Sequence, residues 1–95
     1  MRVIFRDQAL ISLREISVYL ANRWTRREME VLKREINDQL QNILTGLVKH
    51  QEYSSGIYFA LVGKKNVKMY YTVNNDEILV LDFFNVRKNP DSLDL

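Results

Sequence analysis

Hydrophobic and polar residues follow two different periods along the chain. Between residues 8 and 47, apolar residues recur every three or four positions, which is the repeat of an amphipathic helix. From Ile57 onward, short runs rich in β-branched and aromatic residues alternate with turn sequences, which is typical of strands. The pattern therefore predicts helices in the first half of the chain and a β-sheet in the second.

Two helices account for the first pattern. One is predicted over Gln8–Trp24, with Asp7 as its N-terminal cap. The second begins at Thr25-Arg26-Arg27-Glu28, a capping box in which the threonine hydroxyl accepts the glutamate amide proton and the glutamate side chain reaches back. Because almost no linker separates the helices, we expect an antiparallel hairpin whose apolar stripes share one core. These stripes are Ala9, Leu13, Ile16 and Leu20, and then Met29, Leu32, Ile36, Leu40, Ile43 and Leu47.

Strands are predicted on both sides of the helices. A short strand, Arg2–Arg6, precedes them, and Val48–Gly56 follows them as a polar loop without periodicity. Two turn sequences then divide the remaining residues into an antiparallel meander. Its strands are Ile57–Val62, Val67–Val73 and Glu77–Phe84, joined by Gly63-Lys64-Lys65-Asn66 and Asn74-Asn75-Asp76.

The prediction that results is an α+β fold: a short N-terminal strand, an antiparallel helical hairpin and a three-stranded antiparallel meander. It forms a single domain, residues 1–95, with residues 85–95 as a C-terminal tail. Successive side chains of a strand point to opposite faces of the sheet. Val67, Met69, Tyr71 and Val73 are therefore expected to pack on the helices, and Lys68, Tyr70 and Thr72 to line the open face.

Composition narrows the class of protein further. The 95 residues are 46% hydrophobic and 27% charged, which is typical of an ordinary folded domain. The longest apolar run, Ile78–Leu81, is far shorter than the roughly 20 residues that cross a bilayer, and Arg2 and Arg6 interrupt the region where a signal peptide is apolar. We therefore expect a cytoplasmic protein that contacts no membrane. Cysteine is absent, no spacing of Asp, Glu and His suggests a metal site, and no glycine-rich phosphate loop is present, so neither metal nor cofactor is expected.

Three stretches of the sequence resemble one known protein family. Val67–Val73 is similar to a basic-apolar-aromatic-tyrosine strand of that family. Ile78–Leu81 and Phe83–Pro90 are similar to its final strand and its arginine-to-proline tail, and Leu13–Leu20 resembles its first helix. The family is the RelE/ParE toxins of type II toxin–antitoxin systems, and the chain is closer to the ParE-like branch.

The resemblance implies a bacterial, plasmid-stabilisation type of module in which this chain inhibits growth and a cognate antitoxin neutralises it. Some toxins of the family block DNA gyrase without cleaving anything, and others cut messenger RNA in the ribosome. The expected partners are therefore an antitoxin and either gyrase or the ribosome with its messenger RNA, with no small-molecule substrate. A third alternative is a degenerate member of the family without toxicity.

Candidate residues for RNA cleavage are Lys68, Arg87 and Lys88. Cleavage needs a group that activates a 2′-hydroxyl, cations that stabilise the phosphate, and an acid for the leaving oxygen. RNA-cleaving relatives carry a tyrosine or histidine in the C-terminal segment, and no such residue follows Phe84 here. This departure favours gyrase inhibition over cleavage.

A basic patch is predicted where scattered lysine and arginine pairs meet. If the last two strands pair about Asn75, Lys64 and Lys65 lie at the same end of the sheet as Arg87. Tyr70 is expected beside them, where its ring can stack on a base. The predicted target-binding residues are therefore Lys64, Lys65, Tyr70 and Arg87, with Lys68 and Lys88 close by.

Each of these residues also has a purely structural interpretation. The same pairing places Lys68 opposite Asp82, where the two form a cross-strand ion pair. Arg87 and Lys88 are equally explained as solvated charges of a tail. His50, the only histidine, is interpreted as a solvent-exposed loop residue rather than a general base, although its ordinary pKa suits such a role.

The antitoxin is expected to dock an extended segment on apolar surface at the helical hairpin or the sheet edge. Val18 and Val31 lie off the main apolar stripes of their helices. They are the candidates for that contact, although single exposed apolar residues are normal on any surface.

Overall fold

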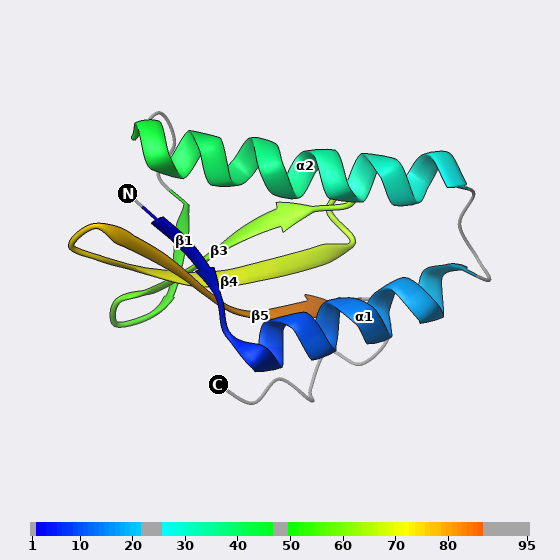
Figure 1. Ribbon diagram of the computed structural model, residues 1–95, viewed down its shortest axis with the longest axis horizontal. Helices are drawn as coiled ribbons and strands as arrows, with labels where there is room; N and C mark the ends of the chain where they lie inside the picture. Colours follow the sequence, from blue (N-terminus) through cyan, green and yellow to red (C-terminus); the bar gives the residue numbers. More distant parts are fainter. Residues whose placement is uncertain (1, 22–25, 47–49, 87–95) are drawn as a thin grey trace.

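A five-stranded sheet carries two antiparallel helices on one face in the computed structural model, which describes residues 2–21, 26–46 and 50–86 (Figure 1). The strands lie in the order β1-β5-β4-β3-β2. The elements are β1 (Arg2–Phe5), α1 (Asp7–Ala21), α2 (Arg26–Thr45), β2 (Gln51–Ser54), β3 (Ile57–Val62), β4 (Val67–Asn74) and β5 (Glu77–Asn85). The predicted α+β architecture is confirmed.

Helix α1 begins one residue earlier than the sequence predicts. The carbonyl of Arg6 accepts the amide protons of Ala9 and Leu10, at 2.8 and 3.2 Å, so Arg6 is the capping residue. Asp7 is already in the first turn of the helix. There its negative carboxylate interacts favourably with the positive end of the helix dipole. The prediction that Asp7 caps the helix is wrong by one position.

Helix α2 follows the predicted apolar stripe, with Leu32, Ile36 and Leu40 buried. Beyond its last residue, Gly46 has a φ of 70°, a left-handed conformation that commonly ends a helix and favours glycine. The predicted capping box cannot be compared, because Thr25 lies outside the described residues. Among the described residues, no helix is long and apolar enough to cross a membrane.

The sheet has two more strands than the predicted meander. β1 pairs in parallel with β5, with Val3 opposite Ile78. β2 pairs antiparallel with β3 and occupies the edge, so the prediction of a loop over Val48–Gly56 is wrong for Gln51–Ser54. All four residues of β2 are exposed, and an exposed strand carries no alternation of apolar and polar residues that sequence can reveal.

A β-bulge shifts the register between β4 and β5. Near the turn, Asn74 pairs with Glu77, and this offset holds as far as Tyr71, which pairs with Val80. Tyr70 pairs with Asp82, so Leu81 is the extra residue on β5. Lys68 consequently lies opposite Phe84, and the predicted pairing of Lys68 with Asp82 is wrong.

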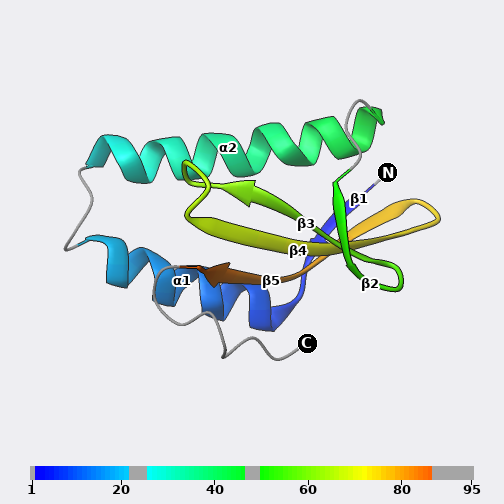
Figure 2. The same ribbon diagram turned by 180° about the vertical axis from the view of Figure 1, so that it is seen from behind.

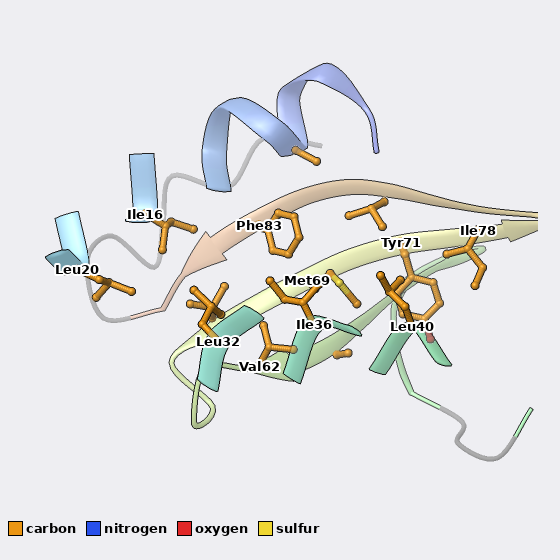
Figure 3. Packing of buried hydrophobic residues seen from close by; sticks show 14 residues of the cluster. Ile16, Leu20, Leu32, Ile36, Leu40, Val62, Met69, Tyr71, Ile78 and Phe83 are labelled. Carbon is orange, nitrogen blue, oxygen red and sulfur yellow. The ribbon is translucent and has the colours of Figure 1, made fainter. Parts of the chain in front are cut away.

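The core fills the layer between the helices and the sheet (Figure 3). Ile16 and Leu20 enter it from α1, and the stripe of α2 enters it beside them. From the sheet come Val67, Met69 and Tyr71, as predicted, whereas Val73 is 45% exposed near the end of the hairpin. The remaining buried members are Ala9, Leu32, Ile36, Leu40, Ala60, Val62, Ile78, Val80 and Phe83.

Candidate functional site on the open face of the sheet

Aromatic residues from three neighbouring strands meet on the face of the sheet that the helices leave open. The ring of Tyr70 on β4 contacts the ring of Tyr53 on β2 edge-on, with the centroids 5.0 Å apart. It also contacts Phe59 on β3 at 5.8 Å. These contacts leave only 1% of Tyr70 exposed, whereas Tyr53 stays 46% exposed at the edge.

Tyr70 is therefore a packed residue in this structure, and its ring is not presented to solvent as a stacking platform. Burial raises the pKa of its phenol, with further contributions from Tyr53 and the negative charge of Asp82. The phenol consequently stays protonated at neutral pH. Tyr53 is the exposed phenol of this face. Its role could not be predicted, because the residues around β2 show no periodic pattern of apolar and polar positions.

Lys68 lies on the same open face and is half-buried. Its ammonium group sits 4.7 Å from the centroid of the Phe59 ring, within the range of a cation–π interaction. Asp82, which was its expected ion-pair partner, instead accepts the backbone amide proton of Phe83 through Oδ1 at 2.8 Å. Among the described residues, Lys68 forms no salt bridge, so its charge is available to an anion.

The turn between β3 and β4 presents Lys64 and Lys65 to solvent. Gly63, Lys64 and Lys65 have φ values of 61°, 56° and 69°, three consecutive left-handed residues. This conformation costs a non-glycine residue about 1 to 2 kcal/mol. It is held in place because the amide of Lys64 donates to Glu35 Oε1 on α2 at 2.8 Å, and Asn66 donates twice to the carbonyl of Gly63.

The end of β5 lies beside this lysine turn, as predicted. The amide of Val86 donates to the carbonyl of Asn66 at 3.1 Å, and Asn85 pairs with Val67. Lys64 and Lys65 are therefore at the end of the sheet where β5 finishes. Arg87 and Lys88, the other predicted members of the basic patch, lie outside the described residues.

His50 is part of an interior hydrogen-bond network rather than an exposed loop residue, so its predicted environment is wrong. Its Nε2 lies 2.8 Å from Gln39 Oε1 on α2, and its Nδ1 lies 2.6 Å from the hydroxyl of Tyr71 on β4. The amide oxygen of Gln39 only accepts, so Nε2 carries the proton and Nδ1 accepts the Tyr71 proton. Both ring nitrogens are engaged, which leaves neither free to act as a base.

Burial shifts the pKa values of both His50 and Tyr71 in the direction that favours this arrangement. It lowers the pKa of His50 below its usual 6.5, which keeps the ring neutral. It also raises the pKa of Tyr71 to about 12, with the nearby Tyr58 adding to the effect. The proton that the two groups share therefore stays on the phenol. No group of three or more His, Cys, Asp or Glu residues that could hold a metal occurs within the described part of the chain.

Exposed apolar residues gather on the outer surface of α1. Val18 is 62% exposed, and Leu10 and Ile11 are each 52% exposed. Ile11 and Val18 are seven residues apart, so they lie on one line of the helix surface. Val31 on α2, the other predicted contact residue, is half-buried.

A comparison with solved structures places this arrangement among known folds. A chain of the chromosomal ParDE TA system from P. aeruginosa matches with a TM-score of 0.69, over 90% of this chain and 95% of that chain. The fold is RelE/ParE-like. The two sequences are 12% identical, so the likeness is one of fold. No protein-family model and no curated protein matches the sequence. The RelE/ParE-like fold that the short sequence resemblances implied is therefore confirmed.

Proposed function

We propose that this chain is the toxin of a type II toxin–antitoxin module, that it inhibits DNA gyrase in the manner of ParE, and that a cognate antitoxin neutralises it. The observation that carries the proposal is the structural match to a chain of a ParDE TA system over nearly the whole length of both chains. The motifs in β4, β5 and the tail support it independently, since they come from the sequence alone.

Inhibition without cleavage is favoured over RNA cleavage by the state of the candidate acids and bases. His50 uses both ring nitrogens inside the fold, and Tyr70 is buried under two aromatic rings. No tyrosine or histidine follows Phe84 in the sequence. Lys68, Arg87 and Lys88 would supply cations to a cleavage reaction, but neither His50 nor Tyr70 is available as the protonated acid that completes such a reaction.

The target is proposed to contact the open face of the sheet and its basic end. Lys64 and Lys65 project from a turn that Glu35 fixes. In the sequence, Arg87 comes two residues after the end of β5. Tyr70 contributes to this face by supporting Tyr53, whose ring remains accessible. A target that binds there would meet a positively charged edge and an aromatic surface together.

The antitoxin is proposed to cover the outer surface of α1. Leu10, Ile11 and Val18 expose apolar side chains on a helix that is otherwise anchored by its buried stripe. Exposed apolar residues on one side of a helix, here with Arg14 and Glu15 between Ile11 and Val18, are the kind of surface on which an amphipathic or extended peptide docks. An antitoxin bound there would contact a different part of the molecule from the lysine turn.

Induced expression in a bacterial host tests the proposal. We expect growth to stop, the supercoiling of a reporter plasmid to fall, and bulk messenger RNA to remain intact. Co-expression of the small protein encoded beside the chain should restore growth. A Leu32→Asp variant, which places a charge in the core, serves as the unfolded control.

Two outcomes would overturn parts of the proposal. Rapid cutting of transcripts on ribosomes that disappears in a Lys68→Ala, Arg87→Ala double variant would replace gyrase inhibition by messenger RNA cleavage. Normal growth with the folded chain present at high level would refute toxicity itself.

A further inference from the structure

The lysine turn lies against the first half of α2, which brings together basic residues that are far apart in the sequence (Figures 1 and 2). The contact that fixes this arrangement is the hydrogen bond from the Lys64 amide to Glu35 Oε1, 2.8 Å long. Its partners are 29 positions apart in the chain. Lys64 and Lys65 therefore project beside the flank of α2 on which Glu35 lies.

Two arginines of α2 lie about a quarter-turn around the helix from Glu35. Arg34 immediately precedes Glu35, and Arg27 lies seven residues before Arg34, nearly two full turns earlier and thus on the same line of the helix. Both arginines are exposed. The sequence shows the doublets but not their meeting, because the contact that relates the turn to the helix joins residues 29 positions apart.

Most cations of this surface form no ion pair. Within the described residues, Arg26 pairs with Glu30 at 3.7 Å, whereas Arg27, Arg34 and the two lysines form no ion pair. Of the other acids nearby, Glu35 accepts the Lys64 amide proton, Asp38 lies one turn beyond Arg34, and Glu28 is next to Arg27. Four cations thus face three carboxylates, and the surface has a small positive excess.

The residue types of this surface indicate which kind of anion it can bind. Neither α2 nor the turn Gly63-Lys64-Lys65-Asn66 contains an aromatic residue, so these two elements offer unpaired bases no ring on which to stack. Arg27 and Arg34 are separated by roughly 10 Å along the axis of α2. This is about the distance that three successive nucleotide steps of one strand cover along the axis of a duplex. Long, exposed cations at this spacing suit a regular phosphate backbone.

We propose that Arg27, Arg34, Lys64 and Lys65 form a surface that binds the phosphate backbone of duplex DNA without regard to sequence. The surface is built from α2 and the β3–β4 turn, and it does not use the aromatic cluster of the open face. DNA binding by this surface requires neither the toxin activity nor any particular protein target. Non-specific binding of this kind has a Kd of roughly 10⁻⁴ to 10⁻⁶ M at physiological salt.

Fluorescence anisotropy with a labelled 20-base-pair DNA duplex, measured over a series of salt concentrations, tests the proposal. The dissociation constant should rise steeply with salt, with a log–log slope of about 3 to 4 for four phosphate contacts. Arg27→Gln, Arg34→Gln and, separately, Lys64→Gln, Lys65→Gln should each reduce that slope by about 2. Glutamine keeps a flexible polar side chain at these exposed positions and removes only the charge and some length, so the thermal unfolding midpoint should be unchanged.

A matched control separates a specific surface from net charge. Arg6→Gln, Arg14→Gln changes two exposed arginines of the α1 region and, like each test pair, lowers the formal net charge from +2 to 0. The control should retain most of the wild-type slope. An equal loss in the control and the test pairs, or a wild-type slope of about 1 or less, would refute the surface. Tighter binding to a duplex RNA or to single-stranded DNA of the same length would refute the choice of duplex DNA.

Discussion

His50 shows how a residue with catalytic potential is used for structure. Its ring joins the segment before β2 to α2 through Gln39 and to β4 through Tyr71, and it also packs edge-on against the Tyr71 ring at a centroid distance of 5.6 Å. Because both ring nitrogens of this half-buried side chain have hydrogen-bond partners, the network holds His50 in one position relative to α2 and β4. Sequence could not reveal this role, because Gln39 and Tyr71 are 11 and 21 residues away.

Removing the Tyr71 hydroxyl should therefore destabilise the fold. In Tyr71→Phe, Nδ1 of His50 loses its donor, and a buried acceptor without a partner costs about 1 to 3 kcal/mol. Urea unfolding followed by circular dichroism should show a loss of about that size. Tyr53→Phe, which removes an exposed phenol, is the control and should change the free energy of unfolding by less than about 0.5 kcal/mol. Equal stability of Tyr71→Phe and the wild type would contradict the network.

The stability of the protein should also depend on pH through His50. Burial lowers the pKa of His50 in the folded state below 6.5, so the unfolded chain binds a proton at a higher pH than the folded chain does. The free energy of unfolding should then be at its full value above about pH 7.5 and should fall as the pH drops through 6.5. Denaturant unfolding at several pH values between about 7.5 and 5.5 measures this dependence.

The control for this pH dependence is His50→Gln, which keeps a polar side chain but does not titrate. The decline toward pH 5.5 should be clearly shallower in His50→Gln than in the wild type. If the two proteins lose stability in parallel, other groups are responsible and the assignment to His50 is wrong.

At the level of elements, the sequence predicted the helices and strands that bury an apolar face, and it missed the features that leave no apolar pattern. The stripes of α1 and α2 and the strands β3, β4 and β5 follow from periodicity, because each buries one face. All four residues of β2 are exposed, so β2 is held by backbone pairing with β3 and by the ring contact of Tyr53 with Tyr70 rather than by a buried apolar face. The bulge at Leu81 is equally invisible, since a register shift leaves the apolar pattern on either side intact.

That unpredicted bulge changes the candidate site. It moves Asp82 opposite Tyr70 and leaves Lys68 opposite Phe84, so the ion pair that pattern alone suggested does not form. Lys64 and Lys65 do lie at the end of the sheet where β5 finishes, because a hairpin brings those positions together for any small error in register. Their predicted meeting with Arg87 and Lys88 falls outside the described residues. The end of the sheet at which the lysines lie thus follows from the topology. Individual cross-strand contacts do not, because they depend on the bulge.

The outer surface of α1 provides a test at the scale of one element. Val18→Asp places a charge where 62% of the side chain is exposed, so the free energy of unfolding should change by less than about 0.5 kcal/mol. If the antitoxin covers this surface, the charge must be desolvated in the complex, and affinity should fall at least tenfold, or about 1.4 kcal/mol. Calorimetric titration of the purified antitoxin into the variant measures the change.

The matched control is Asn37→Asp, which adds one negative charge at an exposed position of α2. It should bind the antitoxin as the wild type does. Unaltered affinity of Val18→Asp would place the antitoxin elsewhere on the molecule, and it would leave the toxin assignment to be judged on growth arrest.

The two-layer arrangement of helices and sheet determines which parts of the molecule are exposed. Helices and sheet share one core, and this leaves the α1 surface, the aromatic open face and the lysine turn as three separate regions (Figures 1 and 2). In our account, the first binds the antitoxin and the other two meet the target. The fold and the position of these regions are thereby linked, because the packing of both helices on one face is what exposes the other.

Inhibition of purified gyrase by the purified chain tests the account most directly. Supercoiling of a relaxed plasmid should decline as the chain is titrated toward the concentration of gyrase, and prior mixing with equimolar antitoxin should restore it. Leu32→Asp, which breaks the core, should have no effect at any concentration. Full supercoiling activity in the presence of a large excess of the folded chain would contradict the account.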